Sequence, residues 1–496
     1  MKKYLPIILA LSIVKLLIHL IGNQNYGFHR DELLHLSVGK HLDWGFMEFP
    51  PFIALIAKIS HSIFGYSLFG MRLFPTFAGI GILVLSCLIA IEIGGKKKTV
   101  LLTGVLILIF NAFYRNHLLF QPVAFDQFFW TLSFYYLVRY IKTHANKYIV
   151  LIGISLAIGF MNKYTIAILL ISIFVSLIAT EREKVIKNKW FYISGIISLI
   201  IVLPNLIWQI QHDFPVLKHF QKLNENQLDA IGKFDFVLGQ IASPFTFIIA
   251  LIGLFALFFD SEIKKYKSIG ITFILVFFLL WFLKSKSYYF YAIYPVMFAF
   301  GAFKVQKMLR NKNVLFYSII SFLVLISFYF IPKDIPVLSI EDYVAYQKIQ
   351  PEKDGRYKLT SDYADMFGWD EQVKLIDSIY TSLPKEDKEK CVLLAENYGE
   401  AGALTIIGEK YNLPKPVCSH GSFWLWGTGK TSGEIGITIG LEKEVVEKAF
   451  EDFQLVKIIH HKYAIDEENN ISVYLCKKPR IKLKDIWPSL ESHIFD

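Results

Sequence analysis

The chain has 496 residues, of which 54% are hydrophobic, 16% are aromatic and only 19% are charged. Soluble domains contain about 45–50% apolar and about 25% charged residues, so this composition favours a protein with many membrane-spanning segments. The formal net charge of +10 comes from short Lys and Arg runs between apolar blocks, which argues against a nucleic-acid-binding protein. Four cysteines lack metal-ligand spacing, and the sequence leaves a disulfide between two of the three C-terminal ones open.

Long apolar blocks recur from the N-terminus to residue 331. A span needs about 20 mostly apolar residues. The basic N-terminus is typical of a signal peptide, but no small-residue cleavage site precedes the charged cluster that follows, so we expect this first span to be retained. The sequence predicts eleven spans, at residues 5–22, 73–94, 99–114, 126–141, 148–161, 165–180, 190–209, 241–259, 268–283, 289–303 and 314–331.

The basic residues of the connecting loops predict the orientation of these spans. Basic loops tend to stay in the cytoplasm. Counting from a cytoplasmic N-terminus, every strongly basic loop falls on the inside: 96–98, 139–147, 181–189, 264–267 and 304–312. The unusual polar segments and the C-terminal part then fall together on the extracytoplasmic face. We therefore expect a multi-pass protein of the cell (inner) membrane.

The first external loop, residues 27–51, combines charge with helical patterns. Asp31 and Glu32 begin a stretch in which apolar residues recur every four positions from Leu34 to Leu42, as on one face of a helix. Acidic residues in a first turn suit the helix dipole, so simple capping is an alternative to a functional role. Pro51 opens a second amphipathic stretch of about 14 residues, which is too short to span and suits the membrane surface.

The composition changes at residues 331–336, beyond which the chain is mixed and charged. We predict two domains, a membrane domain at 1–331 and a small soluble extracytoplasmic α/β domain at 332–496. The expected strands are 391–398, 434–440 and 471–476, and the expected helices are 370–383 and 443–453.

The first loop resembles that of bacterial family 39 glycosyltransferases, which are relatives of protein O-mannosyltransferases and lipid A aminoarabinose transferases in the GT-C superfamily. The shared pattern is an Asp-Glu pair after the first span, then Trp-Gly, then Pro-Pro before an interfacial helix. The resemblance continues in order at residues 122–130, 161–165, 284–302, 396–403 and 421–427. It implies a GT-C membrane helix bundle that transfers a sugar from a polyprenyl-phosphate carrier to a lipid, glycan or protein acceptor at the outer membrane face.

Such a transfer needs fewer carboxylates than glycoside hydrolysis. Glycosidases generally use two, because one must protonate the leaving group, whereas a lipid phosphate leaves readily as an anion. One base for the acceptor proton and cations for the phosphate are then sufficient. Asp31 is the candidate base, as in the family motif. Glu32 is predicted to orient Asp31, bind the acceptor or help hold a metal, and Asp126, at membrane depth, is predicted to join the catalytic pocket or to cap its helix.

Cationic and aromatic residues on the same predicted face are candidates for binding the carrier phosphate. Lys286 is the preferred ligand. Lys163 interrupts a hydrophobic hairpin, with snorkelling to the headgroups as its alternative role. An interfacial anchor belt is the alternative for the residues around Lys286. The full predicted set is Lys163, Lys286, Tyr288, Tyr289, Arg115 and His117.

Two other classes of protein also fit a multi-span chain. A transporter or lipid-linked sugar flippase would carry intramembrane charge, but it would favour internal repeats, and none is evident. A scaffold with an external binding domain would not need Asp31 and Glu32. The pattern predicts no definite cofactor and leaves a divalent metal open, together with the sugar, the acceptor and the role of the C-terminal domain, for which acceptor recognition is one hypothesis.

Overall fold

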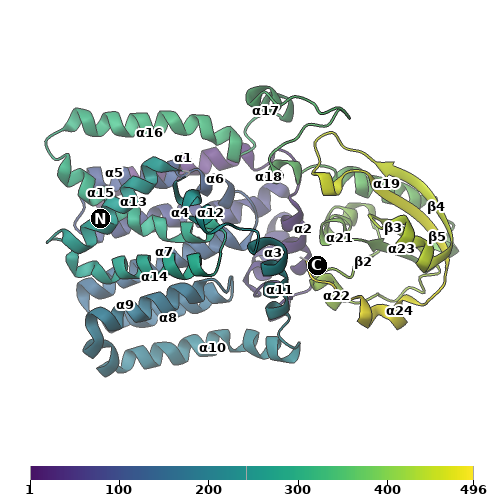
Figure 1. Cartoon of the computed structure of the whole chain (residues 1–496), viewed down its shortest axis with the longest axis horizontal. Coiled ribbons are helices and arrows are strands. Elements are labelled where there is room, and N and C mark those ends of the chain that lie inside the picture. Colours follow the sequence, from purple (N-terminus) through teal and green to yellow (C-terminus); the bar gives the residue numbers. More distant parts are fainter. Residues whose placement is uncertain (1, 242, 495–496) are drawn as a thin grey trace.

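The computed structural model describes residues 2–241 and 243–494. A bundle of long helices occupies one part of the molecule, and an α/β region formed by the C-terminal residues packs against one end of it (Figure 1). Helices occupy all eleven predicted spans: α1 (Leu5–Gly22), α4 (Leu68–Glu92), α5 (Lys97–Ile109), α7 (Pro122–Thr143), α8 (Asn146–Phe160), α9 (Ile166–Lys187), α10 (Lys189–Gln211), α13 (Pro244–Phe259), α14 (Lys267–Phe282), α15 (Tyr294–Met308) and α16 (Asn313–Asp334).

Within the described residues, five helical segments are long and apolar enough to cross a membrane on these criteria alone: Lys2–Gly22, Leu68–Glu92, Lys189–Gln211, Lys264–Phe282 and Asn313–Asp334. A sixth candidate is the bent pair α12 (Lys233–Ile241) and α13. The other predicted spans are shorter or carry more polar residues. The exposed faces of α9, α10 and α16 are rich in Leu, Ile and Phe, as expected for lipid-facing helices. The prediction of a mainly helical membrane bundle is confirmed.

Ion pairs join the predicted basic loops at one end of the bundle. Lys142 donates to Glu92 at 2.8 Å, and Arg139 contacts the same carboxylate. Asp260 accepts from Lys304 at 2.8 Å and from Lys307 at 3.2 Å. In Figure 1 the N-terminus lies at the end of the bundle away from the α/β region. The N-terminal end of the bundle therefore lies away from the C-terminal part, and the orientation of the protein in the membrane stays a prediction.

The first loop folds into two short helices, α2 (Arg30–Val38) and α3 (Phe52–Phe64). The predicted repeat on α2 is partly wrong, because the helix ends at Val38 and Leu42 lies beyond it, half exposed. Helix α2 is also buried on nearly every face, so it lacks the exposed apolar stripe of an interfacial helix. Helix α3 keeps an apolar exposed stripe that includes Leu55 and Ile63, which suits an interfacial position.

Shorter elements close the bundle at the end that faces the α/β region. These are α6 (Ala112–Asn116), α11 (Pro215–Leu223), a π-helical turn at Asn224–Leu228 and a 3-10 helix, η4 (Ser287–Ile293). Helices α2, α3 and α11 lie at the junction between the two parts (Figure 1).

The α/β region contains a five-stranded sheet of order β2-β1-β3-β5-β4. Strand β1 (Cys391–Ala395) runs parallel to β2 (Pro416–Val417) and β3 (Ile435–Ile439), while β5 (Ile471–Pro479) is antiparallel to β3 and β4 (Phe450–Ile459). The helices are α17 (Ile340–Gln347), α18 (Ser361–Ala364), α19 (Trp369–Ser382), α20 (Lys385–Lys390), α21 (Tyr398–Ile406), α22 (Ser422–Leu425), α23 (Lys443–Ala449) and α24 (Leu483–Ile486).

The predicted α/β character and all three expected strand positions are confirmed, but the helix expected at 443–453 is too long. Helix α23 ends at Ala449, and the next residue begins β4. Strand β4 pairs with only one neighbour and exposes most of its residues. An exposed edge strand lacks the alternation of apolar and polar residues that marks a half-buried strand. All four cysteines are free, so the disulfide left open by the sequence is not formed.

Candidate active site

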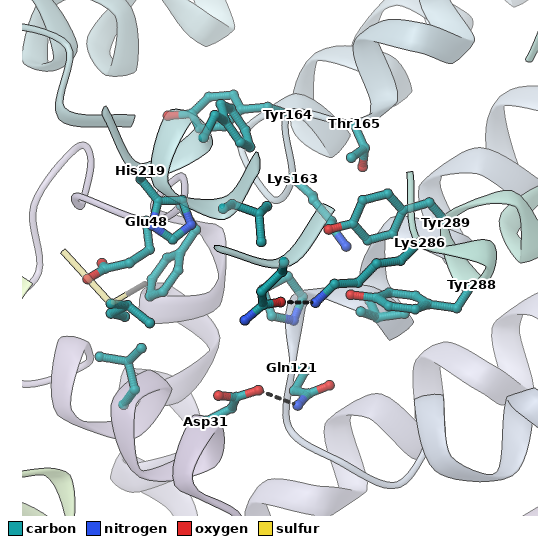
Figure 2. A pocket seen from close by; sticks show the side chains of 18 of the residues that line it. Asp31, Glu48, Gln121, Lys163, Tyr164, Thr165, His219, Lys286, Tyr288 and Tyr289 are labelled. Atoms are coloured by element: carbon teal, nitrogen blue, oxygen red, sulfur yellow. Dashed lines mark hydrogen bonds between the residues drawn. The ribbon is translucent and has the colours of Figure 1, made fainter. Parts of the chain in front are cut away.

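A cavity of about 790 Å³ lies where the bundle meets the α/β region. Its walls combine the first loop, the turn before α9, the region of α11 and η4, and loops of the C-terminal part. Apolar residues such as Ile168, Leu223 and Leu280 line it beside charged and aromatic ones. Figure 2 shows Asp31 and Gln121 on one side of this space and Lys163, Lys286 and the two tyrosines on another.

Asp31 projects into the cavity from the first turn of α2. Its carboxylate accepts hydrogen bonds from Gln121 Nε2 at 2.8 Å and from Tyr398 Oη at 3.1 Å. Burial alone would raise the pKa of Asp31, but His29, His35 and Arg115 lower it more, so the pKa lies below its ordinary value and the group is ionised at neutral pH. His29 occupies the N-cap of α2 and Asp31 lies in the first turn, so Asp31 has both a favourable position near the helix dipole and direct hydrogen bonds in the cavity.

Glu32 points away from the cavity into a fully buried ion pair. Arg72 donates to it from Nε at 3.0 Å and from Nη2 at 2.8 Å, and the backbone N–H groups of His29 and Phe120 complete its shell. Burial alone would raise the pKa of Glu32, and these partners more than offset that effect. Glu32 does not line the cavity and fixes the first loop to α4, so this geometry does not support its predicted contact with the acceptor or a metal, whereas its predicted role in orienting Asp31 stays a prediction.

Lys163 and Lys286 bring positive charge to the cavity, and in the described parts of the chain neither ammonium forms an ion pair with a carboxylate, although Lys163 interacts electrostatically with Asp126 behind the cavity wall. Lys163 Nζ lies 4.3 Å from the centroid of the Tyr289 ring and 5.4 Å from that of Tyr288. Lys286 Nζ donates to Gln227 Oε1 at 2.6 Å. Figure 2 shows the two ammonium groups pointing into the same space. Both amines are therefore available to an anionic ligand.

The structure places the two further predicted phosphate ligands, Arg115 and His117, in different parts of the protein. Arg115 lines the cavity and donates from Nη2 to Asp362 at 2.7 Å, so its charge is compensated. His117 is buried inside the bundle, where its Nε2 lies 3.0 Å from Gln127 Oε1. The residue does not line the cavity, so this geometry gives no support to its predicted role in a phosphate clamp.

Asp126 lies behind the cavity wall. Its carboxylate accepts from Trp130 Nε1 at 3.1 Å and from Thr165 Oγ1 at 3.4 Å, and Thr165 in turn lines the cavity. Gln121 occupies the N-cap of α7, so the capping alternative for Asp126 is not supported, while its role in the catalytic pocket stays a prediction. Through its contact with Thr165, Asp126 holds the turn that carries Lys163.

Several cavity residues were missed by the sequence. Glu48 accepts from the backbone N–H of Ser422 at 2.7 Å, and burial raises the pKa of its carboxyl group. Arg30 pairs with Asp365 at 2.7 Å and with Glu467 at 2.8 Å. These contacts join residues more than 300 positions apart, so no local spacing could have indicated them. The only signal was the resemblance noted at 396–403 and 421–427.

The sequence neither predicted nor excluded a divalent metal, and the described residues provide no ligand set for one. Within residues 2–241 and 243–494, no three or more His, Cys, Asp or Glu side chains are grouped so that they could hold a metal ion. His29 and His35 line the cavity, and His41 instead stacks on Trp426 with ring centroids 4.1 Å apart. No chemical step is therefore derived through a metal.

Comparison with known proteins supports the resemblance. Residues 48–208 match the family model described as dolichyl-phosphate-mannose-protein mannosyltransferase. An uncharacterized protein of Aquifex aeolicus strain VF5 is 25% identical over 219 residues, a match that spans 44% of each protein.

Solved structures resemble almost the whole chain. ArnT from Cupriavidus metallidurans in the apo state superposes with a TM-score of 0.64 at 11% identity, covering 96% of this chain and 98% of that one. The same enzyme bound to undecaprenyl phosphate gives a TM-score of 0.62 at 12% identity, with 94% and 97% covered. An oligosaccharyltransferase of Archaeoglobus fulgidus, tethered to an acceptor peptide, gives 0.51 at 11% identity, with 83% and 64% covered.

These matches show a GT-C fold with a small C-terminal sheet. The family model, which matches residues 48–208, and the shared fold agree with the predicted resemblance to GT-C glycosyltransferases, and neither supports the transporter or flippase alternative. The matched segment at residues 48–208 begins within the first loop and includes the turn that carries Lys163.

Proposed function

We propose that this GT-C protein is an integral-membrane glycosyltransferase that moves a sugar from a polyprenyl-phosphate carrier to a lipid, glycan or protein acceptor. One observation carries the proposal. A single cavity with apolar walls places the ionised Asp31 opposite two lysines, Lys163 and Lys286, neither of which forms an ion pair with a carboxylate among the described residues. A polyprenyl phosphate has an apolar tail and an anionic head, so its binding site needs both apolar walls and cationic groups. The capture of undecaprenyl phosphate by the structurally similar ArnT supports it.

The chemistry divides between the two sides of the cavity. The lysines hold the phosphate, and their charge stabilises the negative charge that develops on it as the sugar–phosphate bond breaks. The acceptor hydroxyl or amine attacks the anomeric carbon and gives its proton to Asp31. The carrier phosphate leaves with the bonding electrons, so no second carboxylic acid is needed. Tyr288 and Tyr289, which pack beside Lys163, form the aromatic wall for the sugar or the first isoprene unit.

The proposed orientation places the cavity and the C-terminal residues outside the cytoplasm. The basic loops lie at the bundle end that is tied together by Glu92 and Asp260, and that end would face the cytoplasm. The cavity would then open at the outer face of the inner membrane. The domain boundary proposed at residues 331–332 falls inside α16, a few residues before its end at Asp334.

Analysis of lipids and surface glycans tests this function. A strain lacking the gene is complemented with the wild-type chain or with Asp31→Asn, which keeps the size of the side chain but removes its charge. We expect carrier-linked sugar to accumulate in the deletion and Asp31→Asn strains, at equal amounts of membrane-inserted protein, and to disappear with the wild type. Unchanged carrier-linked sugar in the deletion strain, or carrier trapped in the inner leaflet, contradicts a transferase.

A further inference from the structure

Tyr398 links the C-terminal region directly to the candidate base. Its hydroxyl donates to Asp31 Oδ1 at 3.1 Å, across 367 positions of sequence. Gln121 Nε2 holds the other oxygen, Oδ2, at 2.8 Å. Because each carboxylate oxygen can accept two hydrogen bonds, both oxygens keep room for the acceptor proton. Tyr398 is 9% exposed and lines the cavity.

We infer that Tyr398 is a positioning residue for sugar transfer, and that the C-terminal region completes the catalytic centre in addition to any role in acceptor recognition. This inference rests on the proposed function, since it assigns Tyr398 a task through Asp31. The hydroxyl fixes the orientation of the carboxylate and stabilises its charged form. Burial raises the pKa of Tyr398 well above its ordinary value, so the phenol stays protonated and remains a donor.

The turn that carries Tyr398 is held by a complete capping box. The Asn397 side chain accepts from the N–H groups of Gly399 at 2.8 Å and Glu400 at 3.1 Å. Glu400 in return accepts from the N–H of Asn397 at 3.3 Å and from that of Glu396 at 2.8 Å. Such reciprocal bonds fix the first turn of a helix. Tyr398 therefore begins α21 in a defined direction.

Close packing between α21 and α2 sets the distance from Tyr398 to Asp31. A Cβ atom added at Gly402 would lie 2.8 Å from Leu33 Cβ, and one at Gly399 would lie 3.2 Å from Arg30 Cβ. Contacts of 2.8 Å force a neighbouring group to move. Glycine at these positions lets the two helices approach closely enough for the phenol to reach the carboxylate. A purely peripheral recognition domain would not require this approach.

The decisive experiment measures the pH dependence of transfer by the full-length protein in lipid nanodiscs. The donor is carrier-linked sugar extracted from the deletion strain, and membranes of that strain supply the acceptor. Tyr398→Phe removes only the hydroxyl. Tyr474→Phe is the matched control, because Tyr474 is equally buried in β5 and does not line the cavity.

For Tyr398→Phe we expect kcat to fall about thirtyfold, within the range for loss of a hydrogen bond to a charged group, while KM for the donor stays unchanged. The acid limb of the kcat profile should move to higher pH, because loss of the donor raises the pKa of Asp31. Tyr474→Phe should change neither. A merely structural role for Tyr398 would lower the amount of folded protein without moving the acid limb.

Gly402→Val gives an independent perturbation, since it separates α21 from α2 without touching the cavity. It should move the acid limb in the same direction as Tyr398→Phe. Unchanged kcat and pH profile in folded Tyr398→Phe, with Asp31→Asn inactive, overturns the inference and leaves the proposed function intact. Full activity of Asp31→Asn overturns the base itself and, with it, the role of Tyr398.

Discussion

The ion pair between Glu32 and Arg72 gives the sharpest prediction about how the first loop is held. Both side chains are 0% exposed and are joined by two hydrogen bonds. Removing one partner of a buried pair leaves a charge without compensation, which costs about 3–5 kcal/mol. For Arg72→Met we expect about 3 kcal/mol, the lower end of that range. The N–H groups of His29 and Phe120 still donate to Glu32 at 3.0 and 2.9 Å.

A double-mutant cycle separates this pair from simple loss of packing. Equilibrium unfolding in mixed micelles of a mild detergent and SDS gives the free energy of unfolding for Arg72→Met, Glu32→Gln and the combination. The double variant should be clearly more stable than the sum of the two single losses predicts, with a coupling energy of at least about 1.5 kcal/mol, since it removes both charges together. A coupling near zero, or a loss below about 1 kcal/mol for Arg72→Met, refutes the assignment.

Three further predictions concern the cavity and the cysteines. The pKa of His29 is raised to about 9, because Asp365, Asp362 and Asp31 outweigh the opposing effect of burial. The charged imidazole should therefore stabilise the fold fully below its ordinary pKa, and this contribution should be lost as pH rises through about 9. Between these two pH values the melting temperature should fall less in His29→Gln than in the wild type. Lys286→Ala should weaken binding of undecaprenyl phosphate in nanodiscs by at least about tenfold. The control Lys284→Ala, which removes a lysine paired with Asp229, should leave the dissociation constant unchanged. An equal loss of affinity in the two variants would identify a non-specific charge effect. All four cysteines are buried and free, so maleimide should label the folded protein slowly and the unfolded protein fully; rapid labelling before unfolding would contradict their burial.

The sequence predicts the bundle well because lipid imposes a strong and local rule. Every spanning helix must present a long apolar stretch, and that stretch is visible without tertiary information. The same locality explains why Asp31, Lys163 and Lys286 could be found. Each interrupts or borders an apolar block, where charge is costly and conspicuous.

The remaining site residues depend on contacts that no local pattern encodes. Tyr398 and Glu48 reach the cavity only because α21 and α22 dock on the first loop. Glu32 and Asp126 were predicted to join Asp31 in the catalytic set, in roles other than the base, but their side chains point into the protein and accept hydrogen bonds from buried donors there. A charged residue beside an apolar block therefore indicated the segments that form the cavity, but it could not indicate which carboxylate side chain faces the cavity.

The rate of sugar transfer by purified Asp31→Asn, compared with the wild type at equal occupancy by donor, tests the central claim most directly. Loss of a general base lowers rates by about 10²–10⁴-fold, and we predict a loss of this size with the affinity for undecaprenyl phosphate unchanged. Transfer by Asp31→Asn at a rate close to that of the wild type would contradict the account.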